Sequence, residues 1–175
     1  MNNTVTLFYC ENPKKTSHEL LRHTASLLTG LSPEEFHTKK APQGKPYFPQ
    51  HPELHFSISH SGNLWICVFS DTEIGCDIQF HTTPKRMDAI VARYFHPNEL
   101  SVYENAPDRL TAFHRIWCRK EAAVKRTGHG IDRTFAETDT TSHDCGVYDV
   151  SLPFSGYSCA VACPSSFRPT IQSLL

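Results

Sequence analysis

The chain has 175 residues, 39% of them hydrophobic, which is enough for a packed core in one compact unit or two small lobes. Its net charge of −1 gives no overall attraction to nucleic acid, so we expect no nucleic-acid partner. No apolar stretch approaches membrane-spanning length, and residues 1–5 lack a basic segment followed by a long apolar run. We therefore expect a cytoplasmic protein that does not bind membranes.

The first part of the chain predicts two strands and a helix. Val5–Cys10 has the composition of a β-strand, and Ser17–Leu28 shows the periodicity of an amphipathic helix with Ser17 as its candidate N-cap. A proline-rich connection follows at Pro42–Pro52. Leu64–Phe69 is apolar throughout and long enough for a buried strand.

Residues 56–62, Phe-Ser-Ile-Ser-His-Ser-Gly, predict a short strand that runs into a polar turn. Phe56 and Ile58 share one face of this strand. The hydroxyls, the imidazole and the backbone N–H groups at such a strand end suit a phosphate. A hydrolase nucleophile is a weak alternative, because neighbouring residues on a strand point to opposite faces and a Gly-x-Ser-x-Gly elbow is absent. A plain turn at a strand end is the simplest alternative.

Residues Glu73–Phe80 carry an informative carboxylate. Every second residue is apolar, which is the period of a half-buried strand: Ile74, Cys76, Ile78 and Phe80. We expect a strand at Gly75–Phe80, and the alternation places Asp77 and Gln79 on the same face. Two such oxygen-bearing side chains, met by a third from a helix, suit Mg²⁺, which prefers oxygen ligands and usually keeps waters and substrate phosphates. For Asp77 alone, a solvent-facing strand edge is the alternative.

The second half of the chain predicts three helices followed by strands. We expect helices near Arg86–Tyr94, Pro97–Tyr103 and Arg109–Thr127. Strands are expected later in the chain, at Phe135, Gly146–Leu152 and Gly156–Cys163. The polar, threonine-rich residues 137–145 are typical of a surface loop.

A second carboxylate, Glu121, falls on the apolar face of the helix expected at 109–127. The apolar residues of that face recur at helical spacing: Leu110, Phe113, Trp117 and Val124. Lys125 follows one turn later, so the two form either an ordinary salt bridge, worth roughly a few tenths of a kcal/mol, or an acid and a cation directed at one ligand. Residues 108–128 hold six basic and two acidic side chains, which suits a phosphorylated cofactor and an acidic protein partner. A solvated helix face is the alternative.

Cysteine and histidine spacing gives no metal motif. The seven cysteines include no Cys-x-x-Cys pair, and most are expected to be buried thiols of a reducing compartment. His51, His55 and His60 lack a matched second pair of ligands, so a structural zinc site is not expected.

Four segments together resemble the 4′-phosphopantetheinyl transferase superfamily, and most closely its longer, surfactin-synthetase-activating type. They stand in the family's order: Gly44-Lys45-Pro46, Phe56–Ser61, Gly75–Gln79, and Trp117–Ala122 followed by Lys125 and Gly128-x-Gly130. The resemblance implies an α+β fold of two pseudo-twofold-related lobes, each a small, mostly antiparallel sheet packed with helices. By this likeness residues 1–73 form the N-terminal lobe, residues 74–175 form the C-terminal lobe, and the site lies in the cleft between them.

The resemblance also implies an activity. A monomeric, Mg²⁺-dependent enzyme of this family moves the 4′-phosphopantetheine arm of coenzyme A to a serine of an apo acyl or peptidyl carrier protein, releasing adenosine 3′,5′-bisphosphate. Asp77, Glu121 and Gln79 would be the metal ligands. Glu121 would also be the base that takes the serine proton, and Lys125 a catalytic cation at the diphosphate. Contacts to coenzyme A would come from Lys45, Ser59, His60, Lys120 and Lys125.

Two departures from the family pattern leave a second hypothesis open. Gln79 stands where glutamate is commoner, and a neutral amide binds Mg²⁺ less well than a carboxylate. The basic segment that longer relatives place near the 3′-phosphate is represented only by Lys14, Lys15 and Arg22. The alternative is a relative that binds coenzyme A or a carrier protein without transferring the arm.

Overall fold

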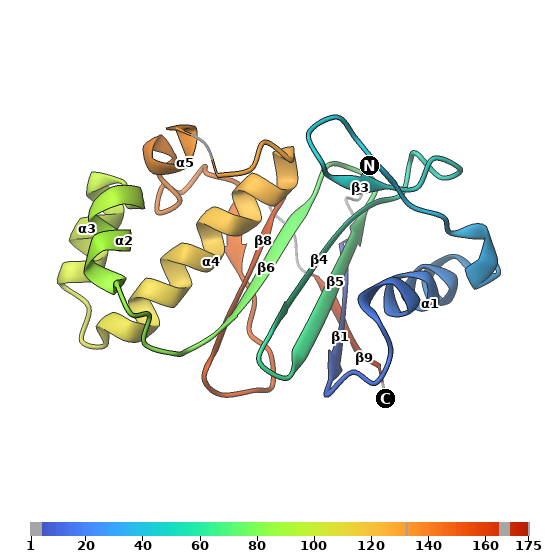
Figure 1. Cartoon of the computed structure of the whole chain (residues 1–175), viewed down its shortest axis with the longest axis horizontal. Coiled ribbons are helices and arrows are strands. Elements are labelled where there is room, and N and C mark those ends of the chain that lie inside the picture. Colours follow the sequence, from blue (N-terminus) through green and yellow to red (C-terminus); the bar gives the residue numbers. More distant parts are fainter. Residues whose placement is uncertain (1–4, 132, 165–168, 175) are drawn as a thin grey trace.

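The computed structural model describes residues 5–131, 133–164 and 169–174 (Figure 1). We expect no basic segment followed by a long apolar run at residues 1–5. Of these residues, only Val5 is among those described. Within those ranges, none of the helices is long and apolar enough to cross a bilayer.

One four-stranded sheet, here called the N-terminal sheet, has the strand order β4-β5-β1-β9. Its strands are β1 (Thr6–Glu11), β4 (His55–Ser61), β5 (Leu64–Ser70) and β9 (Thr170–Ser173). Strand β5 pairs antiparallel with both β1 and β4, whereas β9 runs parallel to β1. Sequence analysis did not predict β9, which returns from the end of the chain to the sheet of its beginning.

A three-stranded antiparallel sheet, here called the C-terminal sheet, has the order β6-β8-β7. Its strands are β6 (Gly75–Phe80), β7 (Val147–Asp149) and β8 (Tyr157–Ala162). A small ribbon of β2 (Lys39–Lys40) and β3 (Pro46–Tyr47) lies in the connection before β4. The predicted bounds of β6 are confirmed.

The helices are α1 (Ser17–Thr29), α2 (Met87–Tyr94), α3 (Pro97–Glu104), α4 (Arg109–Thr127) and α5 (Arg133–Glu137), with a 3₁₀ turn at Pro33–Glu35. The N-cap of α1 is Thr16 rather than the predicted Ser17. The Thr16 hydroxyl accepts the Glu19 N–H at 3.2 Å, and the Glu19 carboxylate accepts the Thr16 N–H at 2.8 Å. This reciprocal capping box fixes the start of the helix.

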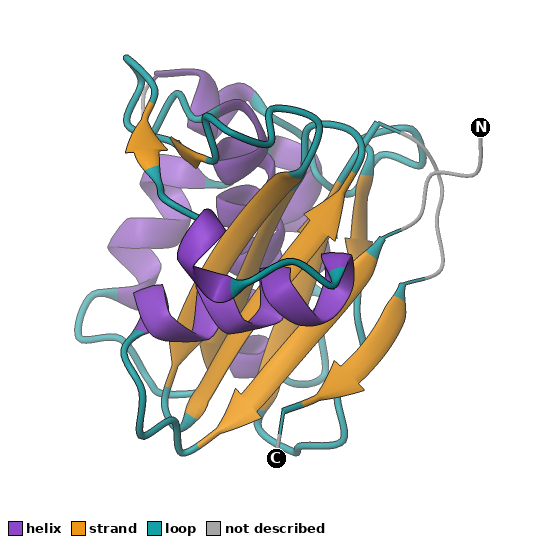
Figure 2. Ribbon diagram, turned by 90° about the vertical axis from the view of Figure 1, so that its right-hand side faces the viewer, coloured by secondary structure: helices purple, strands orange, loops and turns teal. Residues whose placement is uncertain are grey.

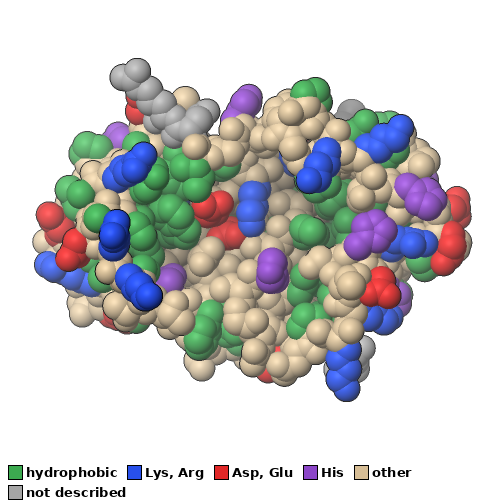
Figure 3. All heavy atoms as spheres, in the orientation of Figure 1, with side chains coloured by type: hydrophobic (Ala, Val, Ile, Leu, Met, Phe, Trp, Pro, Cys, Tyr) green, Lys and Arg blue, Asp and Glu red, His purple; other side chains and the backbone are tan. Residues whose placement is uncertain are grey.

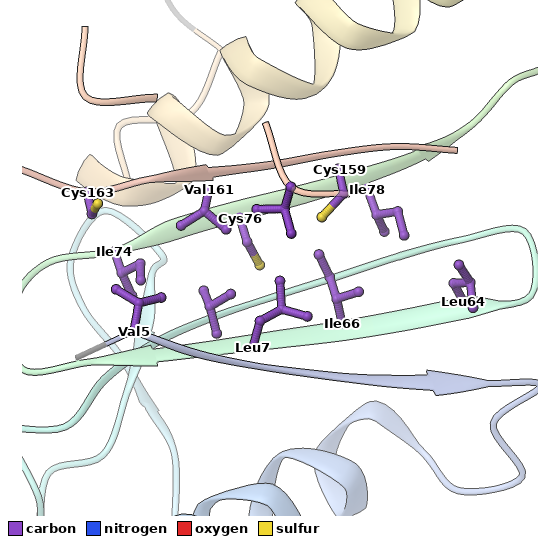
Figure 4. Close-up of a cluster of buried hydrophobic side chains, with 12 residues drawn as sticks. Val5, Leu7, Leu64, Ile66, Ile74, Cys76, Ile78, Cys159, Val161 and Cys163 are labelled. Atoms are coloured by element: carbon purple, nitrogen blue, oxygen red, sulfur yellow. The ribbon is translucent and has the colours of Figure 1, made fainter. Parts of the chain in front are cut away.

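These elements stack in layers, with α1, the N-terminal sheet, the C-terminal sheet and α4 in succession (Figures 1 and 2). Helix α1 covers one face of the N-terminal sheet with Leu20, Leu21 and Ala25. Between the sheets, apolar side chains of both meet in one core, including Leu7, Ile66, Ile74, Ile78 and Val161 (Figure 4). The far face of the C-terminal sheet packs against α4 through small residues: Cys118, Ala122, Ala160 and Ala162. The predicted α+β class, with sheets packed against helices, is confirmed.

Gly75 lies where α4 approaches β6 most closely. A Cβ atom at Gly75 would overlap the carbonyl oxygen of Ala122 and the backbone nitrogen of Arg126, which cannot yield unless the helix moves. We expect Gly75→Ala to lower the unfolding free energy more than Gly130→Ala. A Cβ at Gly130 would enter open space, so that variant bears only the cost of its φ of +75°, about 1–2 kcal/mol. Equal losses in denaturant unfolding would contradict the tight contact.

Two local predictions were wrong. Phe135 lies in α5 rather than in a strand. Its ring packs edge-on against Tyr94 of α2 and Trp117 of α4, and this packing favours the helix. Residues 137–145 are not wholly a surface loop, since Thr140 is completely buried and its N–H donates to Glu99 at 3.0 Å. The division into residues 1–73 and 74–175 stays a prediction, with the difference that β9 joins the N-terminal sheet.

Candidate active site

A cavity of about 340 Å³ opens between α4 and the N-terminal sheet. Residues 43–46 and 56–58 form one wall. Glu121, Val124 and Lys125 of α4 form the other, together with Gly128, Gly130 and Ile131 of the turn that follows. Three of the four sequence motifs therefore meet at this cavity. The fourth, on β6, does not line the cavity, but its Asp77 pairs with the lining residue Lys125.

Asp77 of β6 is only 2% exposed and is surrounded by polar partners. Its Oδ1 accepts hydrogen bonds from the Ser59 hydroxyl at 2.7 Å and from the Lys125 ammonium at 2.6 Å. Its Oδ2 accepts a hydrogen bond from the Gln79 amide at 2.7 Å. The prediction that Asp77 and Gln79 share one strand face is confirmed. A buried charge needs such partners, because desolvation would otherwise make the carboxylate costly.

The two α4 residues have opposite electrostatic roles beside Asp77. Burial, reinforced by the Asp77 charge and opposed by Lys125, raises the pKa of Glu121. Burial alone would lower the pKa of Lys125, but Asp77 and Glu121 outweigh it and the pKa is raised. Lys125 therefore stays a cation, while Glu121 is a better proton acceptor than an ordinary glutamate. The ion pair that Lys125 makes is with Asp77.

Lys45 lines the cavity, but its ammonium is bound to the backbone. It donates to the carbonyl oxygens of Ile74 at 3.0 Å and Arg126 at 2.6 Å, and burial lowers its pKa. The side chain thus ties the loop at 43–46 to the start of β6 and the end of α4. Gly128 follows that helix end with a φ of +80°, as expected for a C-terminal cap.

One residue expected to contact coenzyme A, Lys120, faces away from the cavity. The Lys120 side chain is 0% exposed, and its ammonium lies 2.8 Å from the Glu99 carboxylate and 2.7 Å from the Thr138 carbonyl. It therefore faces α3 and not the cavity. His60 is exposed and lies on the same face of β4 as Phe56 and Ile58, which line the cavity, so its contact with coenzyme A stays a prediction.

Several basic residues of α4 pair with acidic side chains of other elements. Arg115 and Arg119 both pair with Asp149, at 2.7 and 3.1 Å, and Lys120 pairs with Glu99. The expectation that this basic helix suits a phosphorylated cofactor and an acidic protein partner stays a prediction. Lys125 is the cation that α4 brings to the cavity.

Sequence analysis missed two kinds of supporting residue. The Cys118 thiol, treated there only as a buried apolar group, donates to the Asp77 carbonyl oxygen at 3.0 Å. Five of the seven cysteines are buried. Ser57 and Ser61 bond to β6, and their signal was the alternation of serines at 57, 59 and 61.

The acidic groups suit a hard cation that shares its ligands with a substrate. Among the described residues, no three or more His, Cys, Asp and Glu side chains gather into a metal cluster. Asp77 and Glu121 supply two carboxylates, and the Gln79 amide contacts one of them. Mg²⁺ is usually held by one or two carboxylates together with substrate phosphates, so this donor set fits it.

Comparison with known proteins gives one family. The sequence model of one protein family, the 4′-phosphopantetheinyl transferase superfamily, matches residues 73–166. A 4′-phosphopantetheinyl transferase of Bacillus subtilis is 33% identical over 144 residues, which are 81% of this chain and 63% of the relative. The 4′-phosphopantetheinyl transferase AcpT of Salmonella typhi is 34% identical over 135 residues, 75% of this chain and 69% of the relative. AcpT of Escherichia coli O157:H7 is 33% identical over 164 residues, 89% and 76% of the two chains.

The chain thus spans less than two thirds of the length of the Bacillus relative and more than two thirds of the length of the AcpT relatives. The family match covers more than half of the chain and includes Asp77, Glu121 and Lys125. Three of the four segments that resemble the family line one cavity, and Asp77 of the fourth pairs with the lining residue Lys125. On these grounds, the chain belongs to the 4′-phosphopantetheinyl transferase superfamily.

Proposed function

We propose that the protein transfers the 4′-phosphopantetheine arm from coenzyme A to a serine of an apo acyl or peptidyl carrier protein, and releases adenosine 3′,5′-bisphosphate. The observation that carries this proposal is the cluster of Asp77, Glu121 and Lys125, in which Glu121 and Lys125 line one cavity and Lys125 pairs with the buried Asp77. Since all three come from one chain, a monomer is sufficient for activity.

Each of these residues has a role that fits its surroundings. Glu121, with its raised pKa, accepts the proton of the attacking serine hydroxyl. Lys125 balances the negative charge that develops on the diphosphate as its bond to the arm breaks. Lys45 lines the cavity and Ser59 contacts the lining residue Lys125, and these two residues are the proposed contacts to the nucleotide and the phosphates. Lys120 stabilises the position of α4 through its hydrogen bond to Glu99 of α3.

Mg²⁺ is the proposed cofactor, held by Asp77, Glu121 and the amide oxygen of Gln79. When bound, it would neutralise the charge of the diphosphate. The existing bonds of Asp77 keep its carboxylate in place for this role, since Ser59 and Gln79 hold different oxygens of the group.

The surface beside the cavity supports a carrier protein as the acceptor. Figure 3 shows a patch of hydrophobic side chains next to acidic and basic side chains in the middle of this face, over the region of α2, α4 and α5. Met87, Ile90 and Trp117 are partly buried apolar residues of these helices. Exposed Lys85, Arg86 and Arg93 add positive charge, which complements an acidic partner.

The test is to incubate the protein with coenzyme A, Mg²⁺ and a panel of apo carrier proteins, and to measure the intact mass of each carrier. We expect at least one carrier to gain the arm, and the same carrier with its acceptor serine replaced by alanine to gain nothing. Binding of coenzyme A in calorimetry without transfer to any carrier would support the non-transferring relative instead.

Gln79→Glu is expected to lower the Mg²⁺ concentration needed for half-maximal activity. The variant replaces a hydrogen-bond donor to Asp77 by a second carboxylate, so the cation becomes the group that relieves their repulsion. Gln79→Ala should be only mildly impaired, because water can replace a neutral ligand. Gln172→Glu, on exposed β9, is the control for added charge. An unchanged metal dependence in Gln79→Glu would contradict a role for this side chain at the metal.

A further inference from the structure

Strands β4 and β6 lie side by side (Figure 1) but belong to different sheets. Each is an edge strand, β4 of the N-terminal sheet and β6 of the C-terminal sheet. The backbone N–H groups that β6 directs away from β8 therefore need partners from outside their own sheet, because unpaired buried donors are costly.

Three serine hydroxyls of β4 supply these partners. The N–H groups of Cys76, Ile78 and Phe80 donate to the side-chain oxygens of Ser57, Ser59 and Ser61, at 3.1, 3.4 and 2.9 Å respectively. The sequence separation is 19 residues in every pair, so the two strands run parallel in one register. We call Ser57, Ser59 and Ser61 the serine ladder.

Two further contacts lie at the ends of the ladder. The Cys76 thiol donates to the Ser57 carbonyl oxygen at 3.2 Å. At the other end, the Asn63 N–H donates to the Tyr157 hydroxyl at 3.1 Å, which joins the β4–β5 turn to β8. The sheets are therefore linked along the full length of β6.

The register of the ladder determines which side chain of β4 contacts Asp77. Its middle member, Ser59, accepts from the Ile78 N–H and donates to the Asp77 carboxylate, while Lys125 donates to the same hydroxyl at 3.0 Å. A shift of β6 by two residues would bring a different residue to this position, and a shift by one would turn Asp77 to the opposite face. The hydroxyls on either side of Ser59 oppose such shifts.

We propose that Ser57 and Ser61 are positioning residues, which act by holding β6 in register so that Asp77 and Gln79 meet the metal and the phosphates. This inference rests on the proposed function for the role of Asp77. The link between the sheets does not, since it follows from the hydrogen bonds alone. Ser61 is the cleaner probe, because Ser57 also lines the cavity.

The experiment compares Ser61→Ala and the double variant Ser57→Ala/Ser61→Ala with the wild type. Binding of Mn²⁺, as a spectroscopic substitute for Mg²⁺, is followed by electron paramagnetic resonance, and transfer gives kcat and the KM for coenzyme A. Replacing residues that orient a metal ligand usually costs about 10–100-fold in affinity or activity, and we expect the double variant to fall in this range. For Ser61→Ala we expect a smaller loss in kcat with little change in KM.

Two controls separate positioning from general loss of stability. Ser70→Ala removes a buried serine of β5 whose hydroxyl accepts a hydrogen bond from the Thr72 N–H rather than from β6. The Mn²⁺ affinity of this variant should remain that of the wild type. Ser61→Thr keeps the hydroxyl and should restore Mn²⁺ affinity and kcat. If the ladder variants lose stability but bind Mn²⁺ and turn over like the wild type, the positioning role is overturned.

Amide hydrogen exchange at Cys76 and Phe80 tests the ladder apart from the metal. Faster exchange in the double variant is expected, and protection equal to that of the wild type would overturn the link itself. A wild-type protein that neither binds Mn²⁺ nor transfers the arm would contradict the proposed function and, with it, the positioning role. In that case the exchange rates still decide whether the serines join the two sheets.

Discussion

Glu121→Gln is expected to lower the rate of arm transfer by about 10²–10⁴-fold, the usual contribution of a general base. Glutamine has nearly the same shape but accepts no proton and offers Mg²⁺ a weaker ligand. Glu104→Gln, at an exposed position of α3, is the matched control and should keep the wild-type rate. Transfer at the wild-type rate in Glu121→Gln would exclude this residue as the base.

The same variant is expected to remain folded at neutral pH. Burial raises the pKa of Glu121, so the folded state favours the protonated form. The stability this provides is complete below the pKa of the unfolded chain and is lost as pH rises through the folded pKa. At neutral pH the burial of an ionised Glu121 therefore lowers the stability of the folded state, and replacement by neutral glutamine removes this cost. Denaturant unfolding should show Glu121→Gln at least as stable as the wild type there.

Lys120→Met is expected to cost about 3–5 kcal/mol of unfolding free energy, the range for removing one partner of a buried ion pair. Both side chains of the Lys120–Glu99 pair are 0% exposed, so the variant leaves a carboxylate buried without its cation. Adding Glu99→Gln to Lys120→Met should recover much of the loss, because the unpaired charge is then removed. Denaturant unfolding of the single and double variants measures both effects.

The position of Lys120 also predicts what this variant leaves intact. Measured below its unfolding transition, Lys120→Met should bind coenzyme A as the wild type does. Lys125→Met, which removes the cation at the cavity, should weaken that binding. Wild-type stability together with weaker coenzyme A binding in Lys120→Met would instead support the role that the family resemblance implied for this lysine.

Elements with a strict period or a strong terminal signal were predictable from the sequence. The alternation in β6 predicted the shared face of Asp77 and Gln79, and the strand has the predicted bounds, Gly75 and Phe80. Helix α4 begins after Asp108, whose carboxylate accepts two backbone N–H groups, and ends before Gly128 in the left-handed conformation. Strand β9 lacks such signals, because it is four residues long and exposed throughout, and its formation depends on pairing with β1.

The candidate site was predictable only as far as local geometry determines it. Periodicity placed Glu121 on the correct face of α4, but it could not distinguish Lys125 from Lys120 as the cation of the site. Their partners, Asp77 and Glu99, belong to other elements, and these partners decide where each ammonium lies. The serine ladder likewise depends on two sheets meeting edge to edge, so the alternation of serines in β4 does not by itself identify β6 as the partner strand.

The central claim is tested most directly by measuring both products of one reaction. A carrier protein that proves to be a substrate is incubated with the protein, coenzyme A and Mg²⁺, and the arm gained and the adenosine 3′,5′-bisphosphate released are quantified together over time. We predict that the two amounts rise in a one-to-one ratio with the wild type, and that both rates fall together in Glu121→Gln. Release of the nucleotide without modification of the carrier, or equal rates for both proteins, would contradict arm transfer at this site.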